Sequence, residues 1–246
     1  AGGSGRASGT AEMGMGIMGI GKIVGSESHV RYTCQIFGPG EVAAPPDPSA
    51  YAFGSFVRMP LRTTLSAPDA AAPIRGDALP PSLPGQAQSL WAVGLVYDTI
   101  LVNPAFGALG PRLSNDEQLA IFSPDYLVER AVLVSILALG TMSGEGAPSG
   151  RVTHGVPALA PDLGAVVEPL SEAQVRAFHT FADTPQARPY LHLGYLPHTV
   201  AQDHPLLPLA MLRTVERLEA LLPENAALLT IVKRNLAWRL KVLAAG

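Results

Sequence analysis

The sequence predicts an α+β protein in which a small N-terminal β-barrel is followed by a helical C-terminal region. Three observations support this fold class. Stretches rich in β-branched and aromatic residues alternate apolar and polar side chains within residues 19–102, which is typical of strands. Beyond residue 170, apolar residues recur every three or four positions, as on one face of a helix. Between the two regions, Gly and Pro become frequent.

The clearest strand spans Val30–Phe37, where Val30, Tyr32, Cys34 and Ile36 fall on one side and polar residues on the other. We expect Cys34 to be a buried packing residue on this face.

Other segments fit the same barrel. Strands are expected at Gly19–Gly25, Phe53–Met59 and Leu90–Val102, with a bulge or bend at Gly94. Val132–Leu139 fits a strand or a helix, because a short apolar run does not settle the period.

The helical region is marked by start and stop signals. Ser171 with Gln174 forms a capping-box pattern, and Val175, Phe178 and Phe181 follow at three-residue spacing. Leu206–Leu222 carries an apolar stripe that Pro223 ends, and Asn225 is expected to cap a last helix running to about Leu243. An earlier capping-box pattern, Ser114 with Glu117, predicts a short helix.

We therefore expect four parts of the chain. Residues 1–12 read as a flexible arm or expression remnant, 13–143 as the barrel, 144–170 as a linker and 171–246 as the helical region. A long Pro-rich loop, Pro68–Pro84, is expected to connect two strands of the barrel.

Composition limits the class of protein. With 48% hydrophobic residues and a net charge of −3, the 246-residue chain is not expected to be disordered. The net charge is too small to indicate a class of binding partner. Cys34 is the only cysteine, which excludes an intrachain disulfide and a zinc site of several thiolates. No apolar run approaches the ~20 residues of a membrane helix. We expect a cytoplasmic protein with no membrane contact.

Two glycine patterns near the start resemble phosphate-binding motifs. Gly14, Gly16 and Gly19 spell G-x-G-x-x-G, but a strand is expected to follow where that motif needs a helix. A second pattern ends at Lys22, and Ile23 stands where a magnesium-binding Ser or Thr is required. No nucleotide or other cofactor is expected.

Catalytic and metal-binding patterns are also weak. His192, His198 and His204 are six residues apart, which suits packing or loop histidines better than metal ligands. Asp125 and Glu129 lie four apart on an expected helix, which leaves a small acid-dependent hydrolase as an alternative to a solvated helix face. We assign no catalytic, cofactor or metal residues and expect a protein that is not an enzyme.

The C-terminal helix carries the clearest charge signal. From residue 225 onward there are four basic residues and no acid. Lys233, Arg234 and Lys241 fall within an arc of roughly 100° and are candidate nucleic-acid contacts. Basic residues near a helix C-terminus also complement the helix dipole, so both interpretations stay open.

The barrel region resembles the HAS-barrel family, the N-terminal β-barrel of HerA-type DNA translocases and of ATP synthase subunits. The resemblance lies in Ile20–Gly25, Val30–Phe37 and Gly54–Val57, with a looser match at Val93–Val96. It covers the chain only to about Gly140. The RecA-like ATPase domain of those translocases has no counterpart here, so ATPase activity does not carry over.

The resemblance implies a non-enzymatic interaction module that serves as an accessory subunit of a HerA-type DNA-processing assembly in repair or end resection. Its expected partner is an ATPase, a nuclease or a second copy of the chain. We also expect the barrel to be incompletely closed, so that its strand edges carry the partner contacts. The alternatives are a DNA-binding protein that uses the C-terminal helix, and the acid-dependent hydrolase.

Overall fold

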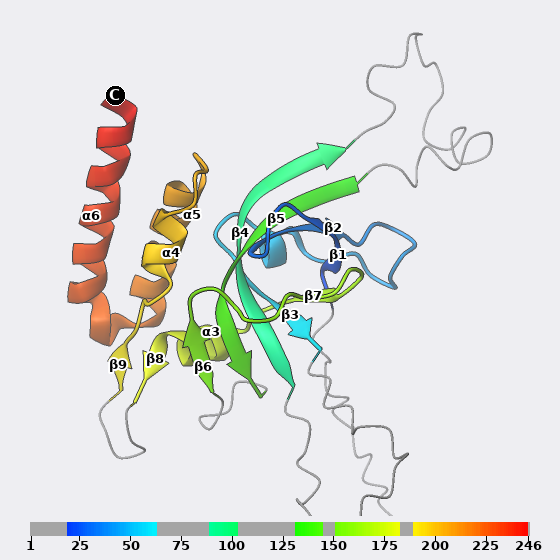
Figure 1. The fold of residues 1–246 in the computed structure, drawn as a ribbon, viewed down its shortest axis with the longest axis horizontal. Coiled ribbons are helices and arrows are strands. Elements are labelled where there is room, and N and C mark those ends of the chain that lie inside the picture. Colours follow the sequence, from blue (N-terminus) through cyan, green and yellow to red (C-terminus); the bar gives the residue numbers. More distant parts are fainter. Residues whose placement is uncertain (1–18, 63–88, 103–130, 145–150, 183–188, 246) are drawn as a thin grey trace, which may run out of the picture.

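Six strands close into a β-barrel, and helices pack against its outer face (Figure 1). The structure is a computed structural model that describes residues 19–62, 89–102, 131–144, 151–182 and 189–245. The elements in chain order are β1 (Gly21–Ser26), β2 (Arg31–Ile36), η1 (Pro48–Tyr51), β3 (Phe56–Leu61), β4 (Leu90–Val102), β5 (Ala131–Ser143), β6 (Val152–His154), β7 (Val166–Pro169), α3 (Glu172–His179), β8 (Thr180–Phe181), β9 (Tyr190–Leu191), α4 (Leu196–Val200), α5 (Leu207–Leu221), η2 (Pro223–Asn225) and α6 (Ala226–Ala245).

The barrel strands run in the order β1-β2-β5-β4-β3-β7, and β7 pairs back to β1. All of these pairings are antiparallel. The long β5 strand pairs with β4 along one edge, while its other edge pairs first with β2 and then with β6. The α+β class is therefore confirmed, but the expectation of an incompletely closed barrel is wrong, because β7 fills the gap between β1 and β3.

The alternation seen in the sequence places side chains correctly in β2. Tyr32, Cys34 and Ile36 are buried, and the residues between them are partly exposed. The expected bend at Gly94 is also present as a register shift between Val93 and Gly94. A Cβ at Gly94 would lie 2.4 Å from the Ile136 Cγ2 atom, so the close packing of β4 on β5 there needs glycine.

The expected linker, 144–170, is not a linker throughout. Within it, β6 extends the sheet and β7 completes the barrel, with Val167 paired to Gly21 and Glu168 paired to Arg58. The boundary at residue 143 does not separate barrel from helices, since β7 is a barrel strand that follows it. With only four residues, β7 is too short to show a period of two, and its pairing partners lie more than 100 residues away.

A buried ion pair joins β7 to β3. The Arg58 side chain is 6% exposed, and its Nε and Nη2 atoms lie 2.8 and 2.6 Å from the same Glu168 oxygen, Oε2. The guanidinium also lies over the Trp91 ring, 4.2 Å from its centroid. The ion pair therefore links the strand that closes the barrel to β3, in addition to the backbone pairing of the two strands.

The helices largely follow the sequence signals. The capping box of Ser171 and Gln174 opens α3, and α5 ends before Pro223 as expected. One detail differs: α3 ends at His179, and Phe181 lies in the short strand β8 instead of continuing the helix. None of the helices among the described residues is both long enough and apolar enough to span a membrane.

Several predictions fall outside the described residues. These are the N-terminal arm, the Pro68–Pro84 loop, the short helix at Ser114 and the carboxylate pair Asp125 and Glu129.

Candidate functional site

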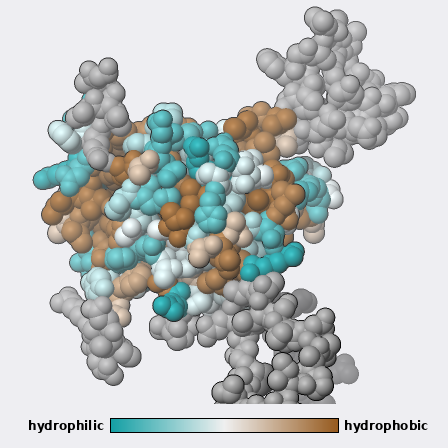
Figure 2. All heavy atoms as spheres, in the orientation of Figure 1, coloured by the Kyte–Doolittle hydropathy of each residue, from teal (hydrophilic) through white to brown (hydrophobic). Residues whose placement is uncertain are grey.

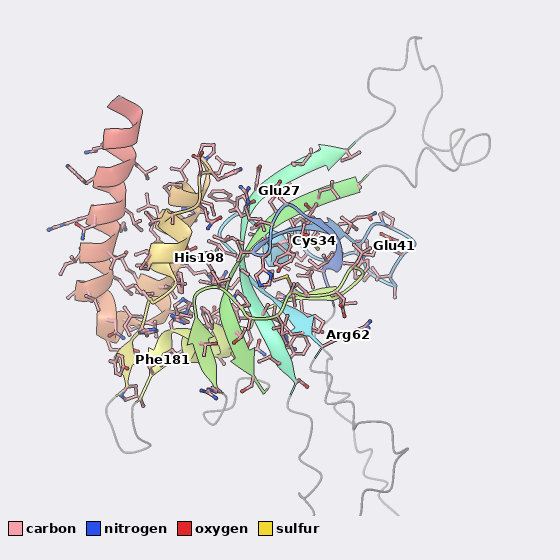
Figure 3. All side chains as sticks on the ribbon, viewed as in Figure 1. Glu27, Cys34, Glu41, Arg62, Phe181 and His198 are labelled. Atoms are coloured by element: carbon pink, nitrogen blue, oxygen red, sulfur yellow. The ribbon has the colours of Figure 1, made fainter. Side chains whose placement is uncertain are left out.

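The barrel interior is filled by side chains. Cys34 lies inside it with no exposed surface (Figure 3), and burial raises the pKa of its thiol to about 12. The thiol is therefore protonated at neutral pH and unsuited to nucleophilic chemistry. The prediction that Cys34 is a packing residue is confirmed.

The sequence patterns near Lys22 lie on a strand. β1 begins at Gly21, so a strand follows the glycine-rich segment as expected. The Lys22 ammonium lies 3.0 Å from the Glu41 carboxylate, in an ion pair at the surface of the barrel. Gly14 and Gly16 lie outside the described residues.

Histidines join the barrel to the helices. His154, on β6, donates from Nε2 to the Phe178 carbonyl, and its Nδ1 accepts from the Gly194 N–H. His192 stacks on the His154 ring with centroids 4.7 Å apart. Burial lowers the pKa of His154 to about 4, so the ring is neutral near pH 7.

His179 lies at the centre of this contact between the strands and the helices. It donates from Nδ1 to the Val175 carbonyl at 2.7 Å, and its Nε2 accepts from the Tyr195 hydroxyl at 2.9 Å. Complete burial lowers the pKa of His179 to about 3. With both nitrogens of His154 and His179 engaged, neither ring is free to act as a base.

The other histidines named by the sequence also pack. His198 lies between α4 and the barrel (Figure 3) and donates to the Ala138 carbonyl, and His204 packs edge-on against Tyr97. The described residues contain no group of three or more histidine, cysteine or acidic side chains that would hold a metal. In the described structure, His192, His198 and His204 therefore all make ring-packing or hydrogen-bond contacts with neighbouring residues.

Two hollows lie on the described surface. One, of about 260 Å³, is lined mainly by apolar residues at a barrel mouth, where the Thr141 and Thr153 hydroxyls hydrogen-bond to each other. The other, of about 570 Å³, lies between residues 49–55 and α5, and Arg213 in its wall pairs with Glu216. Within the described part of the chain, neither hollow pairs a free base with a nucleophile.

The structure divides the three basic residues that the sequence grouped on the last helix. Lys233 turns toward α5, where its ammonium lies 3.0 Å from Glu219 and 3.6 Å from Glu216. Arg234 and Lys241 are exposed and form no ion pair with any residue that the structure describes. Lys233 therefore fastens α6 to α5, and only the other two remain candidate nucleic-acid contacts.

The same helix carries exposed apolar side chains. Leu229 and Leu236 are buried, whereas Leu228, Ile231 and Trp238 are 47%, 56% and 66% exposed. In Figure 1, α6 lies beyond α5 on the side away from the barrel, and Figure 2 shows apolar side chains reaching the surface there among hydrophilic ones. We call the row of Leu228, Ile231, Asn235 and Trp238 the α6 seam.

Sequence reasoning missed this seam. The spacing of Leu228, Ile231 and Trp238 is visible in the sequence, but the interpretation of this helix rested on its basic residues alone. Which of the two apolar sides of α6 packs on α5 depends on tertiary contacts, so exposure could not be read from the sequence alone.

One comparison with known proteins bears on the chain. The family described as "Domain of unknown function (DUF8166)" matches residues 84–245, about two thirds of the sequence. The chain belongs to the DUF8166 family. The matched range begins before β4 and includes β5, β6, β7 and the described helices, so the DUF8166 unit crosses the expected boundary at residue 143. No curated protein matches the chain.

Proposed function

We propose that this DUF8166 protein is a non-enzymatic interaction module in which the barrel is a rigid platform and α6 docks a protein partner. The observation that supports this most is the α6 seam. Its large apolar side chains lie next to one another on one side of a helix whose other side is already packed, and contiguous exposed apolar side chains mark interaction sites.

The size of the apolar side chains fits this role. Burying a fully exposed Leu, Ile or larger side chain contributes roughly 1.5–3 kcal/mol to the free energy of association, and the partly exposed side chains of the α6 seam contribute a part of that each. Ile231 and Trp238 are seven residues apart, about two helical turns, so a single partner element reaches both. They would be the central anchors of the interface, since tryptophan is enriched among the residues that dominate binding.

The resemblance to the HAS-barrel family directs the search for this partner. We propose that the chain is an accessory subunit of a HerA-type DNA-processing assembly, with an ATPase or nuclease as partner. The closed six-stranded barrel is consistent with that resemblance, although the docking face that we propose lies on α6 and not on a strand edge.

The experiment uses the full chain with an affinity tag in its native host. Partners captured by the wild type are identified and then reconstituted with the purified chain. The double variant Ile231→Glu/Trp238→Glu is expected to lose at least tenfold in affinity, because it places two charges in the seam. Leu163→Glu is the matched control, since Leu163 is 76% exposed on a different surface. Equal binding by the wild type and the double variant would refute the proposal.

Nucleic-acid binding is a second candidate, favoured by Arg234 and Lys241, which are exposed and form no ion pair with the residues that the structure describes. Two phosphate contacts predict a shallow slope of about −2 in a plot of log affinity against log salt concentration. Such a site is weak, and the apolar seam beside it matches no feature of a phosphate backbone. We therefore place protein docking first. The hydrolase alternative concerns Asp125 and Glu129, outside the described residues, and stays untested.

A further inference from the structure

The α6 seam has the spacing of a coiled-coil contact face. Its members follow one another at intervals of three, four and three residues, Leu228, Ile231, Asn235 and Trp238, and all four are exposed. This is the interval at which apolar residues meet a second helix that lies alongside the first. Asn235 takes one of the core positions of the repeat, where a polar side chain fixes the register between two helices. The spacing therefore indicates a helix as the occupant.

The charges beside the seam indicate what kind of helix it is. Arg234 precedes Trp238 by four residues and Lys241 follows it by three, so both border the seam at this end. Neither forms an ion pair within the described part of the chain. Lys233, on the other side of α6, shows the contrast, because Glu216 and Glu219 already neutralise it.

A second copy of the chain is a poor occupant. Sequence positions 225–246 contain four basic residues and no acid, so two α6 helices placed side by side would oppose like charges in either orientation. A partner that carries acidic residues on the flanks of an apolar stripe removes this repulsion and pairs with both Arg234 and Lys241.

We propose that the α6 seam binds an acidic amphipathic α-helix of another protein. The helix lies alongside α6, packs apolar residues against Leu228, Ile231 and Trp238, and sets Asp or Glu side chains against Arg234 and Lys241. This inference rests on the proposed function, since it names the chemistry of the partner that docks there.

The test uses the full chain and two synthetic peptides of four heptads. Both peptides have Leu at the two core positions and one Asn in the core, and they differ only in carrying Glu or Lys at the flanking positions. Binding is followed by the anisotropy of a dye on the peptide in low and high salt. We expect the acidic peptide to bind at least tenfold more tightly than the basic one at 50 mM salt, and this ratio to shrink at 500 mM salt.

A charge swap makes the test specific. The double variant Arg234→Glu/Lys241→Glu is expected to reverse the preference, so that the basic peptide binds more tightly. Arg151→Glu, an exposed arginine on the segment before β6, is the matched control and should leave the preference unchanged. Equal binding of the two peptides, or binding of duplex DNA or self-association in place of the acidic peptide, would overturn the inference.

The two proposals fail separately. If Ile231→Glu/Trp238→Glu abolishes capture of the native partner while the peptides are not distinguished, docking at α6 stands and the acidic helix is wrong. If that double variant still captures the partner, the proposed function itself is wrong.

Discussion

At the scale of single residues, the packing of the helices against the strands depends on neutral imidazole side chains. His179 fills both of its hydrogen bonds only in the neutral form, in which Nδ1 donates to Val175 and Nε2 accepts from Tyr195. A proton on Nε2 would remove the acceptor that the Tyr195 hydroxyl needs and would place a charge in a fully buried site.

This arrangement predicts acid sensitivity. The pKa of His179 is about 3 in the folded chain and about 6.5 in an unfolded one. As pH falls below 6.5, only the unfolded state binds the proton, so the free energy of unfolding falls by about 1.4 kcal/mol per pH unit until the folded pKa is reached. Between pH 7.5 and 5.0 this amounts to roughly 2 kcal/mol from His179.

Urea unfolding of the wild type and of His179→Gln at both pH values measures this effect. The variant is expected to be less stable at pH 7.5, yet to lose roughly 2 kcal/mol less than the wild type on acidification. Parallel losses in the two proteins would show that His179 is protonated in the folded state.

Cys34 gives a second residue-scale prediction. Its buried thiol, with a pKa raised to about 12, is expected to react with a thiol reagent only when the barrel opens. Labelling should therefore be slow in native buffer and fast in denaturant. Cys34→Ser should cost roughly 1–3 kcal/mol by placing a hydroxyl in an apolar interior. Rapid native labelling would show that β2 does not face the core.

At the scale of elements, β7 is held by a charge pair that solvent reaches poorly. Removing Glu168 leaves the Arg58 guanidinium buried without its counter-ion, which is expected to cost about 3–5 kcal/mol. Glu168→Ala is therefore predicted to be strongly destabilising in urea unfolding. Glu224→Ala breaks the half-exposed pair with Arg176 and is the matched control, with an expected cost below about 1 kcal/mol. Similar costs for the two variants would contradict the role given to Arg58 and Glu168.

The elements also show what the sequence could predict. Strands with alternating side chains, such as β2, and helices with capping signals, such as α3, were found because their signals are local. β5 stayed undecided because Val132–Leu139 is apolar except for Ser135 and shows no clear period, and only its pairing with β4 and β2 makes it a strand. β7 was missed because its pairing partners, β1 and β3, are distant in the chain.

In the candidate site, too, local features could be predicted from the sequence and tertiary contacts could not. The basic character of the last helix was visible in the sequence, and α6 remains the element with the candidate surface. The sequence could not show that Lys233 meets Glu216 and Glu219, because those contacts depend on how α6 crosses α5. The exposure of the α6 seam also depends on how α6 packs against α5, which the sequence alone does not show.

At the scale of the whole molecule, barrel and helices form one interdependent unit. The segment that leads to the helices supplies β7. From the helical region, His179 packs edge-on against Phe56 on β3, and His198 hydrogen-bonds to the Ala138 carbonyl on β5. A fragment of residues 13–143 would lack β7 and would leave the edges of β1 and β3 unpaired.

We therefore predict that fragment 13–143 does not fold independently. It should aggregate or lack a cooperative unfolding transition, whereas the full chain should unfold in a single transition followed by circular dichroism and Trp fluorescence together. A monomeric fragment with a cooperative transition of its own would restore the domain boundary at residue 143.

The central claim is that α6, and not the barrel wall, carries the partner. Hydrogen–deuterium exchange of the full chain, free and bound to its reconstituted native partner, tests this claim most directly. We predict slower exchange in peptides covering residues 226–245 of the complex, with peptides covering β2 (Arg31–Ile36) unchanged. Protection confined to barrel strands, with α6 exchanging as in the free chain, would contradict it.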